Sequence, residues 1–249
     1  MKDVTQSVSA AMLAIGDELL SGRTRDTNIA YLAENLTMAG IDLREVRIVG
    51  DDQAAIVAGL NALRANHDYV FTCGGIGPTH DDITADAVAA AFGVPCRHDP
   101  AVMEMLAAHY RERGLPFTEA RKRMARLPQG AVPIDNPVSR APGFRIGNVH
   151  VMAGVPSVFQ AMVGNVLPTL KTGRRIESVS VDCPHGEGDI GDRLSDIQTG
   201  HPEVMIGSYP KFDGVRFSTE IVIRGRQRHD VETARQAVVA MIDGLKPDI

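Results

Sequence analysis

The apolar residues of this chain show two alternating sequence patterns, which predict strands and helices in turn. Mostly apolar runs at residues 8–15, 46–49, 69–73 and 149–152 predict strands. The first run carries no charge, as expected for a strand that is buried on both faces of a sheet. Between the first two runs, apolar residues spaced three and four apart over 29–39 predict an amphipathic helix that stops at a glycine. This alternation indicates a mostly parallel sheet with helices on both faces.

Further helices are expected in the middle of the chain. The helical spacing returns at 56–63 and at 85–92, Pro100 is placed to open another helix, and a third helical stretch runs over 118–126. The segment 128–143 is rich in proline and glycine, so we expect an irregular connection there.

The pattern changes beyond the polar stretch 171–175, which we interpret as a domain boundary. A strand is expected at 176–181, a helix over 190–197 and a short strand at Met205. Apolar and polar residues then alternate strictly over 215–223, as in a half-exposed strand, before a closing helix. The order βαββα predicts a small α+β module with an antiparallel sheet that is open to solvent on one face. The predicted domains are therefore 1–172 and 173–249.

Composition narrows the function classes. The net charge is -5 and charged residues make up 23%, so we expect no nucleic-acid partner. Cys73, Cys96 and Cys183 include no CxxC pair, which argues against both a disulfide framework and a zinc knuckle. The N-terminus lacks the apolar core of a signal peptide, and no apolar run approaches the ~20 residues of a membrane span. We expect a cytoplasmic protein without a membrane partner.

The segment Gly74–Thr84 carries the most functional information. Gly74, Gly75 and Gly77 follow a strand and precede a helix, so their bare N–H groups and the helix dipole suit a phosphate. Two adjacent carboxylates, Asp81 and Asp82, would repel that phosphate unless a divalent cation lay between them. The simpler alternative is a helix N-cap at Thr79 with an acid in the first turn. The loop fits neither a dinucleotide fingerprint nor a P-loop.

Two other acidic turns follow predicted strands, at Gly16-Asp17-Glu18 and Gly50-Asp51-Asp52. Successive parallel strands expose their carboxyl ends along one edge, so the three turns should converge on one cleft. Each turn taken singly reads as a solvated turn or cap. Oxygen ligands favour Mg²⁺ or a similar ion over zinc. A further glycine turn, Ala153–Pro156, repeats the strand, turn and helix plan, although an ordinary loop would look the same.

Six groups of residues together resemble the N-terminal part of the CinA competence/damage-inducible family, within the wider MoaB/Mog group of molybdopterin-binding domains. The groups are Gly16-Asp17-Glu18-Leu19-Leu20-Ser21-Gly22, Asp26-Thr27-Asn28, Asp51-Asp52, Gly74 to Thr84, Asn136 with Ala141-Pro142-Gly143, and Gly154-Val155-Pro156. The similarity covers about residues 8–170, and the tail after 175 looks like the KH-like module of these proteins.

The resemblance implies a three-layer α/β/α fold and a pterin or nucleotide ligand with a phosphate or diphosphate. CinA relatives are associated with metal-dependent hydrolysis of ADP-ribose and similar diphosphates, and a related domain is fused to eukaryotic FAD synthases. Molybdenum-cofactor relatives bind or adenylylate molybdopterin instead. The family also implies homo-oligomers.

Site roles follow from the loop pattern and the resemblance together. Catalysis is assigned to Asp82 and Asp51, and the divalent metal to Asp82, Asp81 and Asp52. The residues expected to bind phosphate or the rest of the ligand are Gly74, Gly75, Gly77, Thr79, Asp17, Glu18, Asn28, Ala141, Gly143 and Gly154.

Two departures from the family pattern bear on activity. Val158 stands where the family's usual segment has an acid, which puts metal stoichiometry and hydrolysis in question. The sequence ends at Ile249, so we do not expect the amide-hydrolysing domain of full CinA. Three hypotheses require the same phosphate-binding loop: a metal-dependent diphosphate hydrolase, a molybdopterin-binding or transfer protein, and a regulatory domain that binds nucleotide only.

Overall fold

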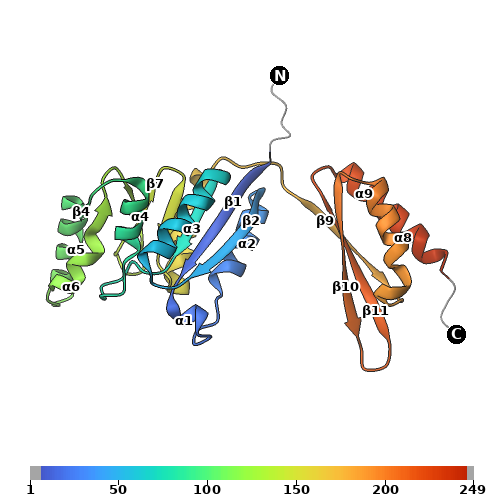
Figure 1. The fold of residues 1–249 in the computed structure, drawn as a ribbon, viewed down its shortest axis with the longest axis horizontal. Coiled ribbons are helices and arrows are strands. Elements are labelled where there is room, and N and C mark those ends of the chain that lie inside the picture. Colours follow the sequence, from blue (N-terminus) through green and yellow to red (C-terminus); the bar gives the residue numbers. More distant parts are fainter. Residues whose placement is uncertain (1–6, 246–249) are drawn as a thin grey trace, which may run out of the picture. The chain divides into compact units, whose positions relative to one another are not determined.

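The computed structural model describes residues 7–245 and divides the chain into two compact units, with the boundary in the sequence between Gly173 and Arg174 (Figure 1). Each unit has its own hydrophobic core and is described separately.

The first unit is built on a six-stranded sheet with the order β2-β1-β3-β8-β7-β6. Strands β1 (Val8–Ile15), β2 (Ile41–Val49), β3 (Tyr69–Cys73) and β8 (Val149–Met152) run parallel. The last two strands, β7 (Gly143–Ile146) and β6 (Val132–Ile134), extend the sheet in antiparallel pairs. The predicted, mostly parallel α/β sheet is confirmed.

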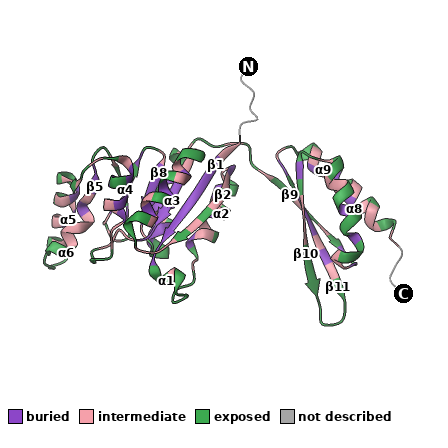
Figure 2. Cartoon of the chain, in the orientation of Figure 1, coloured by how far each residue is buried: buried purple, intermediate pink, exposed green. Residues whose placement is uncertain are grey.

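Helices cover both faces of this sheet, so its central strands are fully buried (Figure 2). Alternate side chains of β1 enter two different cores. One core includes α3 (Gln53–Asn66), α4 (Thr84–Phe92) and α5 (Pro100–Glu112). The other includes α2 (Asn28–Met38) and α7 (Pro156–Val166).

A peripheral segment between α4 and β7 differs from the sequence prediction. Strand β4 (Cys96–His98) pairs with β5 (Arg126–Pro128), and between α5 and β5 the chain forms the short helix α6 (Glu119–Lys122) and the 3-10 helix η1 (Arg123–Ala125). The helical stretch predicted over 118–126 is confirmed over residues 119–125, although it divides into an α-helical turn and a 3-10 turn. The segment 128–143, predicted to be irregular, contains β6, where Pro133 is tolerated because the strand lies at the sheet edge.

The second unit has the predicted order βαββα. Strand β9 (Glu177–Cys183) leads to helix α8 (Glu187–Gly200), hairpin strands β10 (Val204–Phe212) and β11 (Phe217–Gly225), and helix α9 (Arg228–Asp243). The three strands form an antiparallel sheet of order β10-β11-β9. Two details differ: the short strand predicted at Met205 is nine residues long, and Val215 lies in the hairpin turn rather than in a strand.

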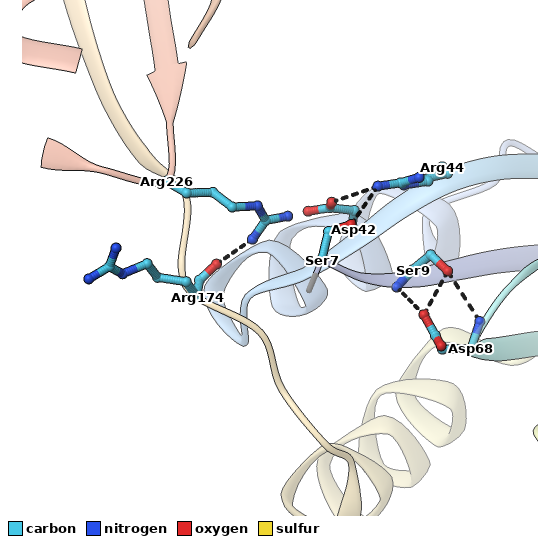
Figure 3. A network of polar contacts seen from close by, with 7 residues as sticks. All are labelled: Ser7, Ser9, Asp42, Arg44, Asp68, Arg174 and Arg226. Atoms are coloured by element: carbon cyan, nitrogen blue, oxygen red, sulfur yellow. Dashed lines mark hydrogen bonds and ion pairs between the residues drawn. The ribbon is translucent and has the colours of Figure 1, made fainter. Parts of the chain in front are cut away.

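The amino ends of the parallel strands are joined by a polar network (Figure 3). The N–H and hydroxyl of Ser9 both donate to Asp68 Oδ2 at 2.8 Å, and the Asp68 N–H donates back to the hydroxyl at 3.2 Å. These bonds from Ser9 lower the pKa of the Asp68 carboxyl. The network fixes the start of β1 against the start of β3.

Among residues 7–245, no helix has both the length and the apolar composition needed to cross a membrane.

Candidate functional site

The carboxyl ends of β1, β2, β3 and β8 meet at one edge of the sheet through their following turns. The Gly16 N–H donates to Val49 O at 3.0 Å, and the Gly74 N–H donates to Met152 O at 3.1 Å. Gly74 has φ +105°, and a Cβ on it would lie 2.1 Å from Ile15 O. Only glycine fits this approach, so the turn after β3 is packed directly against the end of β1.

Two of the predicted acidic turns are joined to each other at this edge. The Asp17 N–H, at the start of α1 (Asp17–Leu20), donates to Asp51 Oδ2 at 3.0 Å, and the Asp51 N–H donates to Asp17 Oδ1 at 3.3 Å. Partial burial raises the pKa of Asp51, and the charges of Asp17, Glu18 and Asp81 raise it further. Acids from all three turns therefore lie within electrostatic reach of Asp51.

The other acids predicted for the metal have local structural partners. Asp82 Oδ2 accepts the Thr79 N–H at 2.7 Å and the Thr79 hydroxyl at 2.6 Å, so it closes its own loop. Asp52 caps α3 through the Ala55 N–H at 2.8 Å. Asp81 is exposed and lies 3.9 Å from the exposed His80. The alternative in which Thr79 caps a helix is not what forms, because α4 begins at Thr84.

The glycine loop presents a run of unpaired backbone donors. Below it, the Thr84 N–H donates to Gly75 O at 3.0 Å and the Thr84 hydroxyl donates to Gly74 O at 3.0 Å. Gly75 has φ +66°, and a Cβ there would lie 2.2 Å from Thr84 Oγ1. Gly75, Ile76 and Gly77 are half-buried residues, and in the described part of the chain their N–H groups donate no hydrogen bond. Runs of successive backbone N–H groups form concave anion-binding sites in other proteins.

A small cavity of about 20 Å³ opens beside this loop. Its wall combines Gly75 and Gly77 with Asp82, Asp86, Arg123 and Arg126. The sequence prediction did not include the last three residues. The only signal was the basic run Arg121-Lys122-Arg123, which a helical interpretation assigns to solvent.

The remaining predicted ligand residues divide into two groups. Asn28 is 4% exposed, its Nδ2 donates to Gly154 O at 2.8 Å, and its Oδ1 is buried without a partner among the described residues. Asn28 and Gly154 are therefore joined to each other, and Gly154 belongs to the glycine turn that follows β8. Gly143 instead lies inside β7, where a Cβ would meet Val151 O at 2.3 Å, and the carbonyl of Ala141 accepts the Asn136 amide at 2.8 Å. The close packing at Gly143 and the hydrogen bond at Ala141 both have a structural role.

The region that the structure describes contains no group of three or more His, Cys, Asp or Glu side chains placed to hold a metal ion. Any metal at this edge would therefore need ligands from water and from the bound molecule. Mg²⁺ commonly binds in this way, through one or two carboxylates plus substrate phosphates. The paired Asp17 and Asp51 fit that requirement.

The sheet and its glycine turns are those of a known domain family. The family described as "Probable molybdopterin binding domain" matches residues 11–172, and the chain belongs to this MoaB/Mog group. Within the group it is a protein of the CinA type. A solved structure of the protein CinA from Thermoplasma acidophilum is 31% identical, with a TM-score of 0.61, and the match covers 66% of this chain and 99% of that one.

Sequence relatives extend the comparison to the second unit. A protein of Archaeoglobus fulgidus is 33% identical over 225 residues, which cover 90% of this chain and 93% of the relative. A CinA-like protein of Thermomicrobium roseum is 35% identical, with 84% of this chain and 53% of the relative covered. Residues 175–246 match a family described as "FAD synthase, middle domain". A "Probable FAD synthase" of Caenorhabditis briggsae is 30% identical, with 96% of this chain and 50% of the relative covered.

Proposed function

We propose that the first unit binds a phosphate-bearing pterin or nucleotide at the carboxyl edge of its sheet and hydrolyses a diphosphate bond of the ADP-ribose or FAD type with a divalent metal. The observation that carries the proposal is the run of three unpaired N–H groups at Gly75, Ile76 and Gly77, next to the start of α4. Unpaired, half-buried donors cost free energy unless an acceptor reaches them. A phosphate supplies several acceptor oxygens at once.

The acidic side of the same edge supports a role for a cation. Asp17, Glu18 and Asp81 all raise the pKa of Asp51, so their negative charges repel one another. A divalent ion held by Asp17 and Asp51 and by the ligand's phosphate would offset this repulsion, and it would supply Lewis-acid activation of water. Asp82 would keep the loop closed through Thr79, so that the glycine N–H groups stay directed to the phosphate.

One observation favours a second function, in which molybdopterin is bound or transferred without hydrolysis. Val158, at the position where the family pattern has an acid, is only 7% exposed and belongs to the core under α7. An acid that would complete a metal site is therefore replaced by a packing residue. This fits the domain description in which molybdopterin is the ligand.

The two functions separate in one experiment. The purified chain is incubated with ADP-ribose, FAD or a molybdopterin source, with Mg²⁺ or with a chelator, and binding and products are measured. Hydrolysis uses one water and breaks the P–O–P bond, so ADP-ribose should give AMP and ribose 5-phosphate only when metal is present. Binding of molybdopterin without turnover of the diphosphates would support the second function. If none of these compounds binds, both functions are wrong.

A further inference from the structure

The cavity beside the glycine loop contains two arginines with different environments. Arg126 donates two hydrogen bonds to Asp86, at 2.8 and 2.5 Å, in a bidentate ion pair. Its charge is therefore compensated within the wall of the cavity. Arg123 comes from the 3-10 helix η1, and in the described part of the chain its guanidinium forms no ion pair.

The single hydrogen bond of Arg123 holds it against the loop. Its Nη2 donates to Asp82 O at 3.3 Å, while its Nε is buried and has no partner among the described residues. A buried guanidinium N–H without an acceptor is costly, because the group is charged and has lost water. Asp82 also lines the cavity, but its Oδ2 already accepts two bonds from Thr79.

The size of the cavity limits what can enter it. A volume of about 20 Å³ accommodates one group of the size of a water molecule. The wall contains Gly75 and Gly77, whose N–H groups have no partner, and Arg123. These unpartnered groups are donors, whereas the carboxylates of the wall already accept bonds, Asp82 from Thr79 and Asp86 from Arg126. The group that fits is therefore a single acceptor atom with negative charge. A phosphate oxygen has these properties.

We propose that Arg123 is a phosphate-binding residue, which takes one oxygen of the ligand's phosphate in this cavity together with the glycine N–H groups. The inference rests on the proposed phosphate-binding function and adds a protein cation to it. Part of the affinity for a diphosphate is then independent of metal, because Arg123 supplies a positive charge that belongs to the protein. Arg126 with Asp86 forms the rigid wall.

The test measures binding of ADP-ribose and of inorganic pyrophosphate to the full chain by calorimetry, in the presence of a chelator. Arg123→Gln should weaken both probes by roughly tenfold to a hundredfold, the usual value of a charge-assisted hydrogen bond. The factor should be similar for both, because the missing contact is to phosphate. The matched control is Arg97→Gln, which removes one positive charge from an exposed site on β4 and should change affinity less than twofold.

The outcomes separate this inference from the proposed function. If the parent protein binds neither probe with or without Mg²⁺, the proposed function itself fails. If the parent binds and Arg123→Gln binds within a factor of two, Arg123 is not a phosphate ligand and the proposed function stands. Where Arg123→Gln melts well below the parent, Arg123→Met, which keeps the apolar stem, replaces it with the same expected loss. A loss for ADP-ribose without a loss for pyrophosphate would also overturn the inference.

Discussion

The two ends of the central sheet are built on opposite principles. At the amino end, the Asp68 carboxylate accepts two bonds from Ser9, and its pKa is lowered. At the carboxyl end, burial and like charges raise the pKa of Asp51, and three N–H groups of the glycine loop have no partner. The same kind of side chain therefore stabilises the fold at one end and is held unfavourably at the other.

The unfavourable contacts at the carboxyl end indicate where a ligand would bind. A folded chain keeps repelling carboxylates, unpaired donors and glycines at positive φ only where something else compensates for them, and such features concentrate at binding sites. The amino end needs no ligand to satisfy its polar groups. Under the proposed function, the polar groups of the carboxyl end find partners when a phosphate accepts from the N–H groups and a cation binds between the acids.

The largest expected effect comes from adding a methyl group to the glycine loop by the substitution Gly75→Ala. Gly75 and Gly93 both have φ +66°, but a Cβ on Gly75 would meet Thr84 Oγ1 at 2.2 Å, whereas a Cβ on Gly93 would meet nothing within 4 Å. Gly75→Ala should cost about 3 kcal/mol of unfolding free energy and abolish ligand binding. Gly93→Ala should lower the unfolding free energy by only about 1 kcal/mol, the cost of placing alanine in a left-handed backbone conformation.

Urea unfolding and calorimetry with ADP-ribose check this pair of variants. Equal losses of stability in both would mean that the loop is not tightly packed on Thr84. Retained ADP-ribose binding in Gly75→Ala would show that the glycine loop is not the phosphate site.

The amino half of β8 gives the molecule a predicted sensitivity to acid. His150 is 2% exposed and stacks on Phe71 at 5.3 Å, and burial lowers its pKa to about 4 from 6.5. The unfolded chain takes up a proton below about pH 6.5, while the folded protein does so only near pH 4. The first unit should therefore lose roughly 3 kcal/mol of stability as pH falls through this window, and nothing from this residue above it.

Hydrogen exchange of β1 and β3 peptides from the full chain measures this loss separately from the second unit. The matched variant is His150→Leu, which keeps an apolar contact with Phe71 and has no titrating group. The acid-dependent loss should be smaller in the variant by most of that amount. An unchanged pH dependence would mean that other groups control acid sensitivity, and that the amino end is not as described.

Much of the fold could be predicted because its central strands are buried on both faces. The runs 8–15, 69–73 and 149–152 match β1, β3 and β8 residue for residue, since continuous burial leaves no Asp, Glu, Lys or Arg inside them. Strands β4, β5, β6 and β7 were missed. They are three or four residues long, and only their tertiary partners define them.

The candidate site could be predicted only as far as topology decides it. The rule that parallel strands end at one edge was enough to bring Asp17 and Asp51 together. The direction of a loop side chain depends on backbone angles that sequence does not fix, so the closure of Asp82 on Thr79 could not be foreseen. Arg123 reaches the cavity from a segment far along the chain, where no local pattern links it to a glycine loop.

The smallest expected effects on stability come from removing one charge at each end of the sheet, and here the stability of the two variants should change with opposite signs. Asp68→Asn removes the charge that strengthens the Ser9 bonds and should cost about 1 kcal/mol, a modest value because Asp68 is exposed. Asp51→Asn keeps an oxygen for the Asp17 N–H and relieves repulsion from Asp17, Glu18 and Asp81.

Stability should therefore stay constant or rise by up to about 1 kcal/mol in Asp51→Asn, while metal-dependent turnover of ADP-ribose falls by orders of magnitude. Ligand binding and turnover should be unchanged in Asp68→Asn. Urea midpoints and product formation with Mg²⁺ provide both readings on the same samples. A loss of stability in Asp51→Asn comparable to that in Asp68→Asn would make the carboxyl-end acids structural, because charges held against repulsion for a cation cannot also stabilise the protein in its absence.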